Sequence, residues 1–68
     1  MLPENFKAIR LAMGWTRDEL AKTLGCEHDD VKRYEEGEYR IPSLLEARML
    51  GAFQLVKTAK EILGGKYA

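Results

Sequence analysis

The stretch from residue 16 to residue 36 constrains the fold of this chain more than any other. Thr16 is followed three residues later by Glu19, the spacing of a capping box at the start of a helix. Gly25 stands where that helix must stop, because glycine readily adopts the positive φ that ends a helix. A second helix is expected directly afterwards, with Glu27 as its N-cap. The pattern predicts two short helices joined by a tight turn.

The same stretch supplies the side chains that two crossed helices need. Such a pair requires small residues where the helices approach and apolar residues that hold them together. Seven positions meet this requirement in order: Leu20, Ala21, Leu24, Gly25, Cys26, Val31 and Tyr34. We therefore expect a helix-turn-helix over residues 16–36, with Cys26 as a small buried hydrophobe and Tyr34 in the core.

A further helix is predicted before this unit. Pro3 is typical of the first position of a helix, and Phe6, Ile9 and Met13 follow with the three- and four-residue spacing of one apolar face. Gly14 ends the pattern. The first helix should therefore run from Pro3 to about Met13.

The last third of the chain, residues 43–63, is predicted to be helical and is a candidate dimerisation element. Ser43 and Glu46 have the spacing of a second capping box. Apolar residues then recur every three or four positions, in a heptad rhythm: Leu45, Met49, Ala52, Val56, Ala59 and Leu63. Other apolar residues lie outside this row: Leu44, Leu50, Phe53, Leu55 and Ile62. One face can pack on the domain and another on a partner, while Gly51 leaves open whether there is one helix or two.

Length and composition indicate a single folded domain over residues 1–68. The hydrophobic fraction of 46% and the charged fraction of 32% are typical of folded proteins, and the patterns above make the fold all-α, with four to five helices. A core this small is only marginally stabilising, which favours a homodimer. No apolar run approaches the roughly 20 residues that span a bilayer, so a cytoplasmic location is expected. One Cys and one His exclude an internal disulfide and do not suffice for most zinc sites.

Over about residues 6–50 the chain resembles the Cro and lambda-repressor-like, or xenobiotic-response-element, helix-turn-helix family. The matching segments are Phe-Lys-Ala-Ile-Arg at 6–10, Gly-Trp-Thr-Arg-Asp-Glu-Leu-Ala at 14–21, Leu-Gly-Cys at 24–26, Val-Lys-Arg-Tyr-Glu-Glu-Gly at 31–37 and Ile-Pro-Ser at 41–43. The resemblance implies a compact lambda-repressor-like DNA-binding domain. It also implies that the chain binds operator DNA as a dimer and regulates transcription.

The resemblance further implies which residues contact DNA. Arg17, at the start of the second helix, would contact phosphate, and Tyr39 and Arg40 would lie in a loop beside the DNA backbone. The base-reading positions fall on the third helix: His28, Asp29, Lys32 and Arg33. Among these, Arg33 is the strongest candidate, because arginine can donate a bidentate pair to guanine N7 and O6.

The charge distribution opposes this interpretation. The chain has 11 basic and 11 acidic residues, and six of the acids fall within residues 27–38: Glu27, Asp29, Asp30, Glu35, Glu36 and Glu38. Against Lys32 and Arg33 they leave a net charge of −4, which phosphates would repel. Acids in the first turn of a helix do favour its dipole, and Asp29 could accept a hydrogen bond from cytosine N4. Seven basic residues could also surround the groove: Lys7, Arg10, Arg17, Lys22, Lys32, Arg33 and Arg40.

The sequence therefore predicts a dimeric repressor that reads a palindromic operator in the major groove and blocks transcription sterically. The alternative is a protein-interaction module, resembling an antitoxin or an anti-repressor, that uses an acidic third helix. An enzyme is not expected, since there is one His, no evident nucleophile and base, and no glycine-rich phosphate loop. The expected partners are double-stranded DNA and a second copy of the chain, without a membrane, a small-molecule substrate, a cofactor or a metal.

Overall fold

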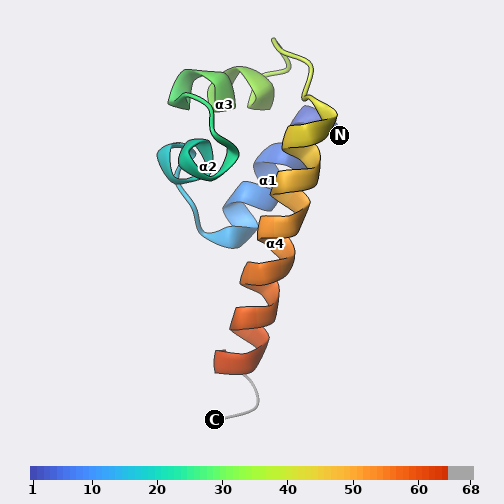
Figure 1. The fold of residues 1–68 in the computed structure, drawn as a ribbon. Coiled ribbons are helices and arrows are strands. Elements are labelled where there is room, and N and C mark those ends of the chain that lie inside the picture. Colours follow the sequence, from blue (N-terminus) through green and yellow to red (C-terminus); the bar gives the residue numbers. More distant parts are fainter. Residues whose placement is uncertain (65–68) are drawn as a thin grey trace.

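The computed structural model describes residues 1–64, and this part of the chain consists of four α-helices without a β-strand. The helices are α1 (Pro3–Met13), α2 (Arg17–Leu24), α3 (His28–Glu35) and α4 (Ser43–Gly64). α1 lies against α4, and α2 and α3 pack on each other beside them (Figure 1). The predicted all-α class is confirmed.

Short-range signals place the ends of α2. The Thr16 hydroxyl accepts a hydrogen bond from the Glu19 backbone N–H at 3.2 Å, and the Glu19 carboxylate accepts one from the Thr16 N–H at 3.0 Å. This is the predicted capping box. At the other end, Gly25 has a φ of 76° and donates its N–H to the Ala21 carbonyl at 2.9 Å. The turn therefore leaves α2 through a left-handed conformation that a side chain would strain.

The helix α3 begins and ends near the predicted residues. Glu27 occupies the N-cap position, and its backbone N–H donates to the Asp30 carboxylate at 3.1 Å. An acid of the first turn thus satisfies one of the free amide groups at the helix start. The helix ends at Glu35, and Gly37 follows in a left-handed conformation with a φ of 78°.

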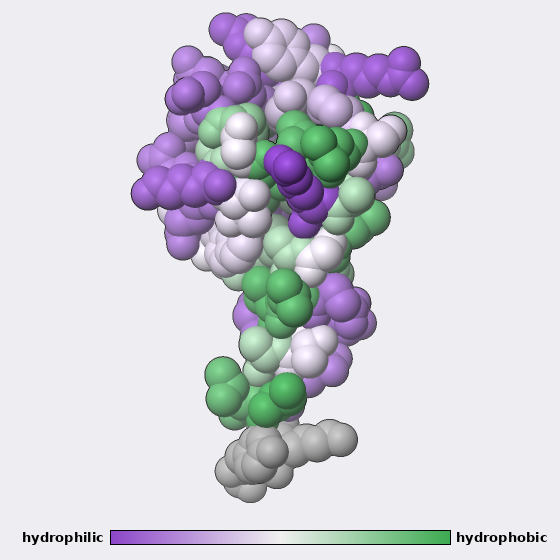
Figure 2. Space-filling model, in the orientation of Figure 1, coloured by the Kyte–Doolittle hydropathy of each residue, from purple (hydrophilic) through white to green (hydrophobic). Residues whose placement is uncertain are grey.

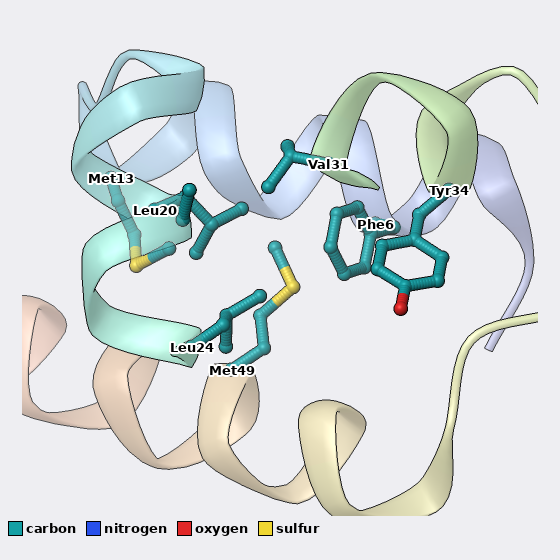
Figure 3. Packing of buried hydrophobic residues seen from close by; sticks show 8 residues of the cluster. Phe6, Met13, Leu20, Leu24, Val31, Tyr34 and Met49 are labelled. Atoms are coloured by element: carbon teal, nitrogen blue, oxygen red, sulfur yellow. The ribbon is translucent and has the colours of Figure 1, made fainter. Parts of the chain in front are cut away.

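All four helices contribute to one core. Its buried hydrophobic residues are Phe6, Met13, Leu20, Ala21, Leu24, Val31, Tyr34 and Met49 (Figure 3). The rings of Phe6 and Tyr34 pack at an angle of 59° with their centroids 5.8 Å apart, joining α1 to α3. Of the seven positions predicted to hold the crossed helices, Cys26 is only partly buried and Gly25 is exposed at the turn. The other five are buried as predicted.

The C-terminal segment is one helix of 22 residues, which decides the alternative left open by Gly51. A Cβ atom added at Gly51 would meet nothing within 4 Å, so the glycine is not required for packing. The predicted capping box at Ser43 is wrong. Ser43 is the first helical residue and not the cap, and the Glu46 N–H donates to the Pro42 carbonyl at 3.0 Å. The Glu46 carboxylate forms an ion pair with the Met1 amino group at 2.8 Å, because α1 and α4 start close together.

Only part of the apolar row of α4 reaches the core. Met49 is fully buried, and Leu45, Ala52 and Val56 are partly buried against the other helices. Ala59 and Leu63 continue the row but are exposed, because α4 extends beyond the ends of α1 and α2 (Figure 1). Among the helices of residues 1–64, α4 included, none has the length and apolar character needed to cross a membrane.

Candidate functional site

The outer face of α3 carries the polar residues singled out by the sequence. Four exposed side chains share it: Asp29, Lys32, Arg33 and Glu36. Their spacing of three, four and seven residues places them on one side of a helix. The opposite side is held in the core by Val31 and Tyr34. α3 is therefore fixed along its apolar side and presents a polar face to solvent.

Arg33 is engaged by the loop that follows α3. Its Nη1 donates to the Glu38 carboxylate at 2.8 Å, and its guanidinium lies 5.5 Å from the centre of the Tyr39 ring. The hydrogen bond to Glu38 is the main cause that raises the pKa of Arg33 above its usual value. The ring of Tyr39 packs edge-on against the ring of Tyr34, with the ring centroids 5.9 Å apart. This contact ties the loop to the core. The guanidinium is thus charged and oriented, but already paired.

A small polar hollow of about 140 Å³ lies at this face. It is lined by Asp29, Lys32, Arg33, Glu36 and Glu38. The structure therefore brings three of the predicted site residues together with two acids, Glu36 and Glu38, that were not predicted as site residues. Glu36 could have been found from the sequence, because it stands four residues after Lys32 and so on the same helix face. Glu38 could not, since its position depends on the loop.

His28 lies at the start of α3 and points outward. Its side chain is 48% exposed, and its Nδ1 lies 3.6 Å from the Asp29 carboxylate. That distance is too long for a hydrogen bond. Both groups are therefore available to a partner that approaches the N-terminal end of α3.

Arg17 has a contact that the sequence reading missed. Its Nε donates to the Glu35 carboxylate at 3.1 Å, and its side chain is 30% exposed. The same carboxylate accepts two hydrogen bonds from Arg10, at 2.5 Å and 3.2 Å. Arg10 also donates to the Trp15 carbonyl at 2.9 Å. Two arginines and one glutamate thus join α1, α2 and α3.

This buried network corrects two expectations. Arg10 was counted among the basic residues around a DNA groove, but its side chain is only 10% exposed and is turned into the protein. Glu35 was counted among the acids that repel phosphate, but its side chain is 1% exposed and paired twice. Without Glu35, residues 27–38 have five acids against two bases, a net charge of −3 and not −4. The exposed charge is still acidic, although less so than the sequence suggested.

The sequence does contain a signal for the buried network. Arg10 stands four residues after Phe6 and three before Met13, on the apolar face of α1. Glu35 stands four residues after Val31, beside the apolar face of α3. A basic and an acidic residue on facing apolar surfaces are expected to pair, because an unpaired buried charge is strongly unfavourable.

The loop residues Tyr39 and Arg40 are placed differently from each other. Tyr39 is 45% exposed and lies beside Arg33, at the polar face of α3. Tyr39 and Arg40 also line a second hollow of about 410 Å³, between the start of α1 and the start of α4. Arg40 is thus not part of the polar hollow. Of the predicted DNA contacts, Asp29, Lys32 and Arg33 lie together on α3 with Tyr39 of the loop beside Arg33. His28 lies at the start of the helix, and Arg17 and Arg40 lie outside this group.

The outer face of α3 carries charges and hydrogen-bond donors. Within residues 1–64 no three His, Cys, Asp or Glu side chains are grouped so as to hold a metal ion.

Cys26 lies in the turn before α3. Burial, reinforced by Asp30 and Glu27, raises the pKa of its thiol, so the thiol is a poor nucleophile at neutral pH.

Comparison of the chain with protein-family models, with curated proteins and with solved structures finds no match. The function of the α3 surface therefore has to be inferred from its geometry and its charges.

Proposed function

We propose that the protein is a sequence-specific DNA-binding transcriptional regulator that places α3 in the major groove. The observation that carries the proposal is the outer face of α3, a polar surface on a helix whose other side is held in the core. Eight residues of helix are about 12 Å long, and the major groove is about 12 Å wide. A rigid helix of this size, with donors and an acceptor on its outer face, suits direct contact with base edges.

The residues of this face have complementary roles in the proposal. Arg33 donates to guanine N7 and O6, which discriminates roughly 10- to 100-fold against another base. Asp29 accepts from cytosine N4, and Lys32 contacts a base or a phosphate. His28, at the exposed start of α3, contacts a base or the DNA backbone. The acids that flank these residues add repulsion, so affinity should depend on a correct set of contacts more than on general attraction to DNA.

The pairing of Arg33 with Glu38 is compatible with base contact. The two side chains are 47% and 50% exposed, and ion pairs at that exposure contribute little to stability. A guanine can therefore displace Glu38 with a loss of only about two- to fivefold in affinity. Arg17 keeps further donors beside the one used by Glu35, and it can offer these to a phosphate while staying in the network.

Selection from random-sequence DNA with the full chain tests the proposal, followed by binding measurements at several salt concentrations. Arg33→Ala should abolish the base preference at one base-pair position. Lys32→Ala should either weaken binding to all sequences, if Lys32 contacts a phosphate, or reduce the base preference at a different position, if it contacts a base. Helix content by circular dichroism should be unchanged in both variants, because both side chains are exposed. The proposal would be refuted if the selection enriched no sequence. It would also be refuted if Arg33→Ala lowered the affinity for all DNA sequences equally.

A matched pair of charge variants tests the role of Glu38. Glu38→Gln and Glu36→Gln remove the same charge from neighbouring positions, but only Glu38 is bonded to Arg33. Both should strengthen DNA binding by reducing repulsion, and Glu38→Gln should add a further two- to fivefold on the selected sequence. Equal effects of the two variants would show that Arg33 is not held back by Glu38.

A protein-interaction module is the second candidate, and the acids around α3 favour it. Asp29, Glu36 and Glu38 surround the two basic residues of the face. That surface would suit a basic protein partner better than a polyanion. This function predicts no DNA binding even at low salt, and a captured basic partner whose binding is lost with Asp29→Asn and Glu36→Gln together. Retained binding in that double variant would exclude the acidic face as the contact.

A further inference from the structure

We infer that Tyr39 is a positioning residue for Arg33, and that its ring holds the Arg33 guanidinium at the outer face of α3, where it can donate to a guanine. The inference rests on the proposed function, because it concerns how α3 recognises a base. The guanidinium lies over the Tyr39 ring, 5.5 Å from the ring centroid. Cation–π contacts are effective within about 6 Å of the centroid. Tyr39 therefore contacts the side chain of α3 that is best suited to read a guanine.

The Tyr39 ring is itself supported by the core. It packs edge-on against the ring of Tyr34, which is 9% exposed. The Tyr34 ring in turn packs against the fully buried ring of Phe6 (Figure 3). Three aromatic rings thus lead from the core to the guanidinium. Because side chains packed in a core keep a defined rotamer, this row gives Arg33 a rigid support.

The backbone of the loop fixes Tyr39 next to Arg33. The Arg33 carbonyl accepts a hydrogen bond from the Glu38 N–H at 2.9 Å and another from the Tyr39 N–H at 3.4 Å. Gly37 allows the chain to turn back in this way, because its φ of 78° favours glycine. The two hydrogen bonds use only main-chain atoms. The loop should therefore keep its path when the Tyr39 side chain is replaced.

Tyr39 and Glu38 hold the same guanidinium in different ways. Glu38 accepts a hydrogen bond from Nη1 of Arg33 at 2.8 Å and so occupies one of its donors. The aromatic ring attracts the charge through its π electrons and occupies none of the five N–H donors. A guanine can therefore replace Glu38 while Tyr39 stays in contact with Arg33. Glu38 opposes base contact, and Tyr39 supports it.

Both members of the contact lie where DNA can reach them. The Arg33 side chain is 47% exposed, and Tyr39 is 45% exposed. Figure 2 shows polar residues gathered at the end of the molecule that carries α3, whereas hydrophobic residues gather lower, along α4. Once Glu38 is displaced, an arginine at this exposure would otherwise adopt many rotamers, and ordering it on binding lowers affinity. By ordering Arg33 in advance, Tyr39 should raise the preference for guanine roughly two- to fivefold, the range for an exposed cation–π contact.

Tyr39→Phe and Tyr39→Leu are the matched variants, because phenylalanine keeps the ring and leucine replaces it with an aliphatic side chain. Nuclear magnetic resonance of the full chain without DNA tests the contact. In the parent, the ring current of Tyr39 should shift the side-chain resonances of Arg33 upfield. Tyr39→Phe should keep this shift, and Tyr39→Leu should abolish it. Helix content by circular dichroism should be unchanged in both variants, because Tyr39 lies in a loop and is half-exposed.

Binding to the selected DNA, and to DNA altered at the base pair that depends on Arg33, tests the consequence for recognition. Tyr39→Leu should lower the ratio of the two affinities roughly two- to fivefold, and Tyr39→Phe should lower it by less than about 1.5-fold. In an Arg33→Ala background, Tyr39→Leu should change the affinity for the selected DNA by less than about 1.5-fold, because the ring then has no guanidinium to hold.

Arg33 resonances that are the same in the parent and in Tyr39→Leu would overturn the inference without any DNA measurement. An unchanged affinity ratio in Tyr39→Leu would also overturn it. Equal losses in Tyr39→Phe and Tyr39→Leu, or the same loss with and without Arg33, would overturn it in favour of a direct contact between Tyr39 and DNA. If the parent selects no sequence although its Arg33 resonances are shifted, the proposed function has failed, and the role of Tyr39 in base recognition fails with it.

Discussion

Replacement of Glu35 by alanine should remove most of the stability of this protein. Its carboxylate is the only acidic partner of Arg10 in the structure of residues 1–64, and the Arg10 side chain is 10% exposed. Removing the glutamate leaves an arginine charge buried among α1, α2 and α3. Breaking a buried ion pair in this way costs about 3–5 kcal/mol. A domain of 68 residues has a total stability of roughly 3–10 kcal/mol, so the loss is a large fraction of the whole.

Urea unfolding followed by circular dichroism measures this loss, and two controls identify its cause. Glu36→Ala removes the same charge from the next residue, which is exposed, and should change stability by less than about 0.5 kcal/mol. Arg17→Ala should cost about 1 kcal/mol, because Arg10 still pairs with Glu35 and the Arg17 side chain is partly exposed.

A double variant provides the decisive comparison. Arg10→Met combined with Glu35→Leu removes both charges and keeps similar volumes, and it should recover stability to within about 1 kcal/mol of the parent or exceed it. If Glu35→Ala lies within about 1 kcal/mol of the parent, the buried charge is not as costly as argued. If the double variant is as unstable as Glu35→Ala, the loss comes from packing and not from the unpaired arginine.

Three further predictions follow from local geometry. Gly51→Ala should raise the free energy of unfolding by about 1 kcal/mol, because the added Cβ meets nothing within 4 Å and alanine favours a helix. Gly25→Ala should lower it by about 1–2 kcal/mol, because a φ of 76° disfavours a side chain. Urea unfolding measures both changes, and two changes of the same sign would contradict the reasoning. Hydrogen bonds from Thr16 lower the pKa of Glu19, so this carboxylate stabilises the fold above its unfolded pKa and ceases to do so as the pH falls through its folded pKa. The parent should therefore exceed Glu19→Gln in urea midpoint at pH 7, and the difference should shrink as the pH falls below the ordinary pKa of a glutamate and through the lower folded pKa of Glu19; a constant difference would exclude the charge as its origin. The Cys26 thiol should react with iodoacetamide more slowly than the thiol of glutathione does at neutral pH, because burial raises the pKa of Cys26. Equal rates for the two thiols would contradict a raised pKa.

The sequence by itself determined where α2 begins and where α1 and α2 end. Thr16 with Glu19, Gly14 and Gly25 act through bonds and torsion angles within four or five residues, so their effect does not depend on the rest of the chain. The apolar spacing likewise identified Phe6, Leu20 and Val31 as residues of the buried side, because helical periodicity assigns a face before any partner is known. The outer face of α3 was predicted for the same reason.

Tertiary structure decided which charged residues pair with each other. Arg10 and Glu35 stand on or beside the apolar faces of their helices, but they lie 25 positions apart, and only the packing of α1 on α3 makes them partners in one ion pair. Glu38 reaches Arg33 because the loop after α3 folds back, and that path is not set by local sequence. The open end of α4 has the same origin. Its apolar row runs on unchanged, while the helices that cover the first half stop short of the second.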